Sequence, residues 1–185
     1  MDNPRINIRY ARALFELAGE NKVLKETSTD MALVADTCHK NRELQLLLKS
    51  PVINAKKKIS IIREIFGQML GKVSMAFVEI IIRKRREEHL MNIALKFGDI
   101  YRDHNNIKKA VVTTISPLTD EMRRQLIGVL SKQTGATIEL SEETDPSIIG
   151  GMIVKLDGLQ FDDSIRKKLQ NLKNEFNVNT FIREF

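Results

Sequence analysis

Two adjacent glycines, Gly150 and Gly151, open the stretch that most restricts how this chain of 185 residues folds. Glycine takes a positive φ without strain and lets another backbone segment approach closely, so the pair predicts a turn or a close approach between strands. Met152, Val154 and Leu156 follow at every second position, which predicts a β-strand. The stretch therefore indicates architecture and contains no obvious catalytic group.

A turn and a helix complete this C-terminal stretch. The dipeptide Asp157-Gly158 predicts a tight turn, and either Asp162 or Asp163 can accept the free N–H groups at the start of a helix. Apolar residues then recur every three or four positions, at Ile165, Leu169, Leu172 and Phe176. We assign four residues to the fold and the helix start rather than to contact with a partner, namely Gly150, Gly151, Asp162 and Ser164.

Helical periodicity dominates the first half of the chain. Asn3-Pro4 predicts an N-cap followed by a first-turn proline, and turn signals such as Ser50-Pro51 separate the later helices. The predicted helices cover residues 4–19, 22–38, 41–49, 54–66, 72–84 and 87–104. Six helices of this length indicate a bundle.

A polar run at residues 103–106 ends the helical pattern and predicts a domain boundary. Beyond it, residues 109–115 and 136–140 predict strands, and Thr119 predicts the start of a helix between them. We therefore expect a mainly α fold in two domains: an N-terminal six-helix bundle over residues 1–105 and a small C-terminal α+β domain over residues 106–185.

Composition narrows the class of protein. Hydrophobic residues make up 42% of the chain, which is enough for a core. The N-terminus lacks an apolar signal core, and the apolar run at residues 75–82 is short and contains Glu79, so neither secretion nor membrane spanning is expected. The single cysteine, Cys38, allows no intramolecular disulfide and fits a reducing compartment.

Three further segments belong with residues 145–169. They are Tyr-Ala-Arg-Ala-Leu-Phe-Glu-Leu-Ala at 10–18, Ser-Pro-Val-Ile at 50–53 followed by Lys58, Ile62 and Phe66, and the set Arg86, Leu90, Ile93 and Phe97. In this order the four blocks resemble the delta subunit of F-type ATP synthases, the bacterial relative of the mitochondrial oligomycin-sensitivity-conferring protein. Because the blocks span nearly the whole chain, it is identified as a member of that family.

The first and last helices of the predicted bundle each carry two apolar faces, whereas a single-sided surface helix needs one. Either both helices are central and wrapped by neighbours, or each has a partner outside its own core. The resemblance favours a partner: in delta subunits the first and fifth helices of the bundle form a groove for the amphipathic N-terminal helix of a headpiece α subunit. With residues 4–19 and 87–104 as these helices, the candidate groove residues are Tyr10, Leu14, Phe15, Ala18, Leu90, Ile93, Ala94, Phe97 and Tyr101.

The resemblance also implies a mechanical role. Delta subunits are non-catalytic stator parts that join the catalytic headpiece to the peripheral stalk, whose b subunits engage the C-terminal domain, so that proton flow is coupled to ATP synthesis. The chain is therefore expected to need no cofactor or metal. It is also expected to lie at the cytoplasmic face of the bacterial plasma membrane, as a peripheral part of the complex.

An enzyme is one alternative, with Cys38 and His39 as nucleophile and base. Adjacent residues on a helix do not face each other, however, and no orienting group is evident. His89 and His104 lack metal-ligand spacing, and the glycine pair lacks the spacing and the lysine of a phosphate loop.

A basic helical adaptor for nucleic acids is the second alternative, because the basic runs 83–86 and 56–58 can neutralise phosphates. Glu87 and Glu88 follow the first run directly, and cations ending one helix with anions starting the next suit both helix dipoles. Since no RNA-binding motif with stacking aromatics is present, we favour a solvated helix junction. Many family members place Gly or Asn in this turn, where this chain has basic residues.

Overall fold

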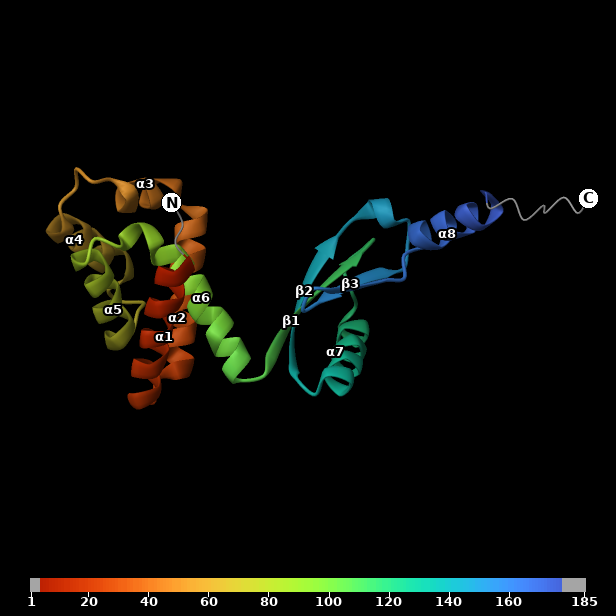
Figure 1. Cartoon of the computed structure of the whole chain (residues 1–185), viewed down its shortest axis with the longest axis horizontal. Helices are drawn as coiled ribbons and strands as arrows, with labels where there is room; N and C mark the ends of the chain where they lie inside the picture. The colour runs from red at the N-terminus through yellow and green to blue at the C-terminus, as the bar shows by residue number, and fades with distance from the viewer. Residues whose placement is uncertain (1–3, 178–185) are drawn as a thin grey trace, which may run out of the picture. The chain divides into compact units, whose positions relative to one another are not determined.

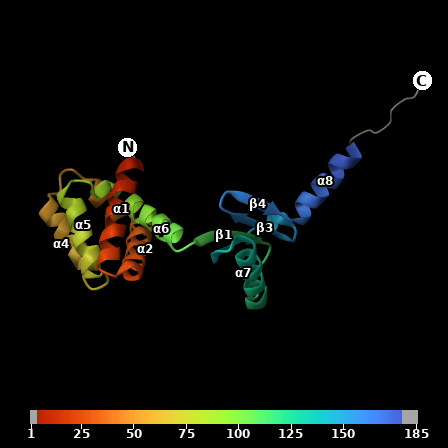
Figure 2. The same cartoon turned by 60° about the horizontal axis from the view of Figure 1, so that its bottom comes forward.

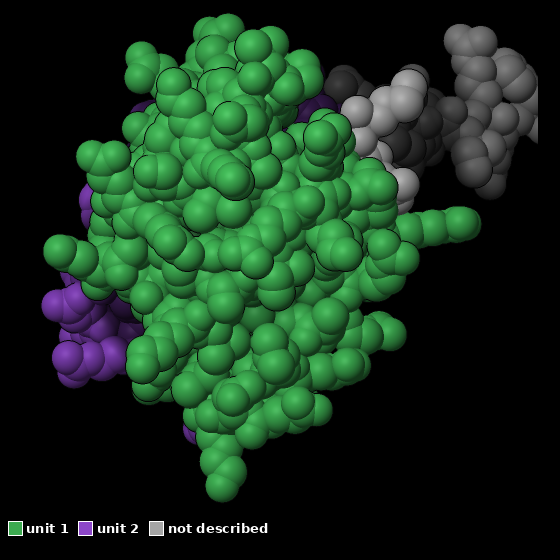
Figure 3. Space-filling view, turned by 90° about the vertical axis from the view of Figure 1, so that its left-hand side faces the viewer, with its two compact units in different colours: residues 1–105 green, residues 106–185 purple. Residues whose placement is uncertain are grey.

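The computed structural model describes residues 4–177, and the chain divides into two compact units, residues 1–105 and residues 106–185 (Figure 3). The first unit is helical, and the second is built around a β-sheet (Figures 1 and 2). The predicted fold class, a helical bundle followed by a small α+β part, is confirmed. The predicted cap Asn3 lies outside the described residues.

Six α-helices and one short 3-10 helix make up the described part of the first unit. They are α1 (Pro4–Glu20), α2 (Leu24–Lys40), α3 (Arg42–Lys49), α4 (Ala55–Phe66), α5 (Lys72–Arg83), η1 (Glu87–His89) and α6 (Leu90–His104). The helix ends lie within two residues of the predicted ones, except that the segment predicted as 87–104 is divided into η1 and α6.

A single apolar core holds the bundle together. α1 buries Ala11, Leu14 and Ala18 completely, at the spacing of three and four residues that keeps side chains on one helix face. α1 and α2 both pack along α6, whose Phe97 is also fully buried. Asp30 of α2 accepts a hydrogen bond from the backbone N–H of Gly71 at 2.9 Å, which satisfies a free donor at the start of α5.

A buried lysine joins three segments of the bundle. Lys58 of α4 is only 2% exposed, and its Nζ donates to the backbone carbonyl of Leu48 at 2.7 Å and to Oε1 of Glu87 at 2.5 Å. The end of α3, the first half of α4 and the start of η1 therefore meet at one ammonium group. A buried charge is tolerated only when it is paired and hydrogen-bonded in this way.

A four-stranded sheet forms the second unit. Its elements are β1 (Ile107–Thr114), α7 (Asp120–Thr134), β2 (Thr137–Thr144), η2 (Pro146–Ile148), β3 (Met152–Leu156), β4 (Leu159–Asp162) and α8 (Ile165–Asn177). The strand order is β2-β1-β3-β4; β1 pairs parallel with β2, and the other two pairings are antiparallel. The strand predicted at 136–140 runs on to Thr144, because its whole length pairs with β1.

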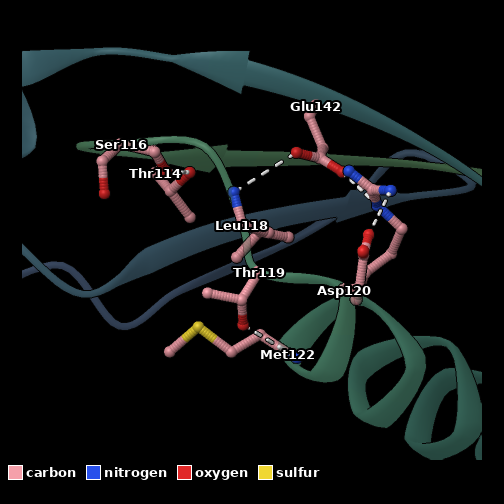
Figure 4. A network of polar contacts seen from close by, with 8 residues as sticks. Thr114, Ser116, Leu118, Thr119, Asp120, Met122 and Glu142 are labelled. Atoms are coloured by element: carbon pink, nitrogen blue, oxygen red, sulfur yellow. Dashed lines mark hydrogen bonds and ion pairs between the residues drawn. The ribbon is translucent and has the colours of Figure 1, made fainter.

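α7 lies along one face of this sheet and is fixed to β2 by polar contacts (Figure 4). Arg123 of α7 donates from Nε to Oε1 of Glu142 at 2.6 Å and from Nη1 to Oδ1 of Asp120 at 3.2 Å. Thr119 caps the helix by accepting the N–H of Met122 at 3.3 Å, as predicted. The small apolar core beneath α7 consists of Ala110, Val112, Leu130, Ile138, Val154 and Leu156.

The glycine pair brings the start of α8 against the beginning of β3. Gly151 has a φ of 77°, and a Cβ there would lie 2.3 Å from the carbonyl oxygen of Asp163. A close backbone approach is therefore present, but it joins β3 to the residues in front of α8 rather than to another strand. The backbone N–H of Ile165 donates to the carbonyl of Gly150 at 3.0 Å. No residue with a side chain fits position 151 without displacing this contact.

Ser164, rather than either aspartate, is the N-cap of α8, so the predicted cap is wrong by one or two positions. The Oγ of Ser164 accepts a hydrogen bond from the N–H of Lys167 at 3.1 Å. Asp162 instead accepts the N–H of Ser164 at 3.0 Å, which makes a turn two residues long in front of the helix. Both residues thus serve the helix start, as assigned.

Candidate functional site

α1 packs against α6 through one of its two flanks. The ring of Phe15 lies 6.1 Å from that of Phe97 and 5.1 Å from that of His104, measured between centroids. Ile8 precedes Phe15 by seven residues, or two turns, and therefore lies on the same flank. The helices that contain the nine predicted groove residues are neighbours in the structure.

Six of the nine residues nevertheless belong to the core. Leu14, Ala18, Leu90, Ile93, Ala94 and Phe97 are at most 2% exposed. Tyr10, Phe15 and Tyr101 are partly exposed. Among the nine, only these three aromatic side chains can touch a partner without rearrangement of the bundle.

Counted along the chain, the fifth helix is α5, and residues 87–104 contain the sixth. Residues 87–104 were also sixth among the six predicted helices, so matching them to the fifth helix of the family was a miscount, and α5 is the helix in that position. In both views α5 lies beside α1, on the side away from α6 (Figures 1 and 2).

The flank of α1 that does not contact α6 is apolar and open. Tyr10 and Leu17 are seven residues apart and lie roughly opposite Phe15 around the helix; Leu17 is 42% exposed. On α5, Glu79 binds Arg63 of α4 at 2.6 Å, so the side of α5 that carries Glu79 faces α4. Val73 and Ile80 lie on a different flank of α5, which points away from α4. We call the following set the N-terminal strip: Ile6, Tyr10, Ala13, Leu17, Val73 and Ile80.

A second apolar surface follows α8. Its four periodic residues are between 43% and 81% exposed and are here called the C-terminal stripe: Ile165, Leu169, Leu172 and Phe176. Among the described residues, α8 makes its main contact with η2 and leaves this face uncovered. Leu159 and Phe161 of β4 are also more than half exposed.

The sequence signal for both surfaces was the apolar periodicity itself. It placed Leu17 and the C-terminal stripe on apolar helix faces, but it did not separate covered faces from open ones, and the predicted groove residues did not include Leu17. It gave no indication of Ile80, because α5 is apolar on most of its circumference.

The thiol considered as a nucleophile is unsuited to that role. Cys38 is 1% exposed, and burial raises its pKa to about 11. The thiolate is therefore rare at neutral pH and out of reach of a substrate, while His39 is exposed. Within residues 4–177, no cluster of three metal-ligating side chains occurs, and no helix is long and apolar enough to cross a membrane.

The basic turn is partly neutralised by neighbouring carboxylates. Glu79 accepts from Arg63 at 2.6 Å and from Arg83 at 3.2 Å, and the hydrogen bond from Arg63 is the main cause of the lowered pKa of Glu79. Arg85 has a φ of 56°, the left-handed conformation that Gly and Asn adopt most readily. Arg85 therefore takes a conformation that suits it less well than it would suit Gly or Asn.

Comparisons with known proteins give one consistent result. The family model described as ATP synthase delta (OSCP) subunit matches residues 6–176. ATP synthase subunit delta of Cytophaga hutchinsonii is 32% identical over 176 residues, covering 95% of this chain and 96% of its own. The subunit of the same name from Salinibacter ruber is 36% identical, covering 91% of this chain and 89% of its own. A chain of the Toxoplasma gondii mitochondrial ATP synthase hexamer shares the fold, with a TM-score of 0.70 at 18% identity, over 92% of this chain and 96% of that one.

Proposed function

Because this chain belongs to the ATP synthase delta (OSCP) subunit family, the non-catalytic stator subunits that link F1 to the peripheral stalk, we propose that its two units divide the link between them. The helical bundle binds the N-terminal helix of an α subunit of F1. The sheet-containing unit binds the b subunits of the stalk. The observation that carries this division is that each unit exposes apolar side chains along a helix, in the N-terminal strip of the bundle and in the C-terminal stripe of the second unit.

The N-terminal strip suits an amphipathic helix. Leu17 and Ile80 are 42% and 46% exposed, and the half-buried ring of Tyr10 lies one helical repeat before Leu17. Apolar anchors at successive turns of two neighbouring helices are the usual form of a helix-binding site. The first and fifth helices supply them here, so Tyr10 stays a contact residue and the buried residues of α6 support the bundle from within.

The complex places the chain at a membrane without requiring it to enter one. Through its stalk partners the subunit lies at the cytoplasmic face of the bacterial plasma membrane, as a peripheral part of the proton-transporting ATP synthase. Its contribution to coupling is a static connection that resists the torque on F1.

A titration with two matched variants tests the bundle site. The full chain is titrated with a synthetic peptide of the same organism's α-subunit N-terminus, followed by NMR at low and high salt. Leu17→Asp is expected to weaken binding about tenfold or more, because an apolar anchor is lost. Ile8→Asp is the control, since Ile8 is 41% exposed and lies on the flank towards α6.

Saturable binding that tolerates salt, with loss confined to Leu17→Asp, supports the strip. Loss confined to Ile8→Asp would move the site to the flank beside α6. Absence of binding by the folded wild-type chain would overturn the α-subunit assignment.

A further inference from the structure

A cavity of about 400 Å³ opens in the helical unit, and no residue of the N-terminal strip lines it. Its lining comes from the end of α3, the start of α4 with the loop before it, and the turn after α5, namely residues 48–55, Lys58, Arg85, Glu87 and Glu88. Lys58 belongs to the basic run 56–58 and Arg85 to the basic run 83–86, so the fold brings the two runs to one cavity. Its volume is typical of sites for small ligands.

Two cations of this lining have no partner among the described residues. Lys49 and Arg85 are both exposed, and neither takes part in the ion pairs of the bundle. Lys58, by contrast, is already paired with Glu87. The lining therefore offers an ammonium and a guanidinium to an anionic group, and the planar guanidinium suits the paired oxygens of a phosphate.

Carboxylates border the same cavity, so a simple anion does not match all of its lining. Oε2 of Glu87 is buried and has no hydrogen-bond partner among the described residues, because Lys58 contacts only Oε1. Glu88 is half exposed and contacts Nε2 of His89 at 3.1 Å. A buried acceptor without a donor costs free energy. These groups favour a ligand that carries an N–H donor as well as an anion.

The loop before α4 supplies the apolar part of the lining. Pro51, Val52 and Ile53 follow one another there, and the side chain of Val52 is 90% exposed. A bare phosphate ion would leave this part of the cavity unfilled. The lining combines an anion site, an acceptor for N–H and an apolar wall, and this combination matches a phosphate joined to a nucleobase.

We propose that this cavity binds a nucleoside phosphate. The phosphoryl group pairs with Arg85 and Lys49. The base lies against Val52, and its amino group donates to Glu87. The inference adds a small ligand to the bundle and depends on neither of the two partner surfaces described above.

A helix-terminal role is the simplest alternative for Arg85, because a cation suits the C-terminal end of α5. The backbone N–H groups of Arg85 and Arg86 bond back to the last turn of α5, with Arg85 in the left-handed position. α1 ends with the same pair of bonds, and Lys22 takes the left-handed position there with a φ of 58°. Lys22 does not line the cavity, so it is a matched control for Arg85.

The test is a titration of the full chain with adenosine monophosphate, followed by NMR and calorimetry. Saturable shifts are expected in residues 48–58 and 85–88. The affinity is expected to exceed that for inorganic phosphate or adenosine about tenfold or more, because each fragment makes only part of the contacts. Arg85→Asn is expected to weaken binding about tenfold or more, because a charge-assisted pair is lost. Its stability is kept, since asparagine suits the left-handed position. Lys22→Asn is expected to bind like the wild type.

Two further comparisons separate the base from the phosphate. Val52→Ser is expected to weaken binding of adenosine monophosphate about threefold or more, because apolar contact is lost, and to leave binding of inorganic phosphate unchanged. Leu46→Ser is the control, since Leu46 is 59% exposed and lies outside the cavity. Purine riboside monophosphate lacks the amino group of adenine and is expected to bind several-fold more weakly. Equal binding of the two nucleotides would overturn the contact with Glu87.

Three outcomes overturn the inference as a whole. Absence of binding by the folded wild-type chain removes the site. Equal loss of binding in Arg85→Asn and Lys22→Asn assigns binding to the overall charge of the bundle instead of the cavity. A single-stranded oligonucleotide that binds more tightly than the mononucleotide, with no dependence on Val52, replaces the cavity with a nucleic-acid surface on the basic runs.

Discussion

The two units differ in how far they bury their apolar side chains. The bundle buries Leu14 of its first helix completely, along with the fully enclosed Lys58, and its open apolar residues border a closed core. Among its described residues, the sheet-containing unit buries only eight apolar residues and leaves a helix with four exposed ones, among them Leu172. A domain with so small a core has little stability to spare. We therefore expect the bundle to fold alone and the second unit to gain stability when a partner covers its exposed apolar residues.

Equivalent truncations in the two units are expected to give the largest contrast. Leu14→Ala removes a fully buried side chain and is expected to lower the free energy of unfolding of the bundle by about 2–5 kcal/mol. Leu172→Ala removes an exposed one and is expected to change stability by at most about 0.5 kcal/mol. Urea unfolding of the full chain, followed by NMR signals from each unit, measures both. Similar costs at the two positions would mean that α8 is already covered in the free chain, which would break the comparison.

Two glycines of the second unit are expected to act in opposite directions. Gly151→Ala forces a side chain into the left-handed region and against the carbonyl of Asp163, and it is expected to cost about 2 kcal/mol or more. Gly128→Ala, inside α7 with no atom within 4 Å of the added carbon, is expected to stabilise by about 0.5–1 kcal/mol. Thermal unfolding by circular dichroism distinguishes the two. A neutral Gly151→Ala would show that the corner between β3 and α8 is looser than the contact indicates.

The smallest effect is expected at a feature that both units share, a glutamate bound by an arginine. Hydrogen bonds from arginine lower the pKa of Glu79 in the bundle and of Glu142 in the second unit. A carboxylate whose folded pKa is lowered stabilises the fold above the unfolded pKa of about 4.3, and that contribution is lost as the pH falls through the folded value. The deficit of Glu79→Gln or Glu142→Gln relative to the wild type should therefore be present near neutral pH and shrink in acid. Melting temperatures across this range provide the measurement, and a deficit independent of pH would assign the effect to packing.

Sequence reasoning located most of the elements and less of the site. The six helices, the close approach at Gly151 and the cap at Thr119 follow from local rules of spacing and backbone geometry, which act before tertiary structure forms. Exposure does not follow from them: Leu14 and Leu17 belong to one periodic apolar face of α1, yet one is buried and the other is 42% exposed. The difference lies in which helix packs beside α1, a non-local property that periodicity does not contain.

The same limit explains the misplaced cap of α8. Asp162, Asp163 and Ser164 can all accept backbone N–H groups, so their chemistry alone does not choose among them. The choice is made by pairing of the strands, because β4 pairs Asp162 with Ile153 and thereby ends the strand one turn before Ile165. Ser164 is then the residue in position to cap.

The buried ammonium of Lys58 also has a consequence for the order of folding. Its two acceptors are ten and twenty-nine residues away in sequence, and the cost of removing the charge from water is offset only when both have arrived. Until then, burial of the Lys58 ammonium opposes compaction of the bundle. The two hydrogen bonds of Lys58 are therefore expected to form late, after the helices have associated. A conservative change there should accelerate unfolding more than it slows folding, the behaviour of a contact absent from the transition state. Loss of the Lys58 contacts is therefore expected to shorten the lifetime of the folded bundle more than it slows its formation.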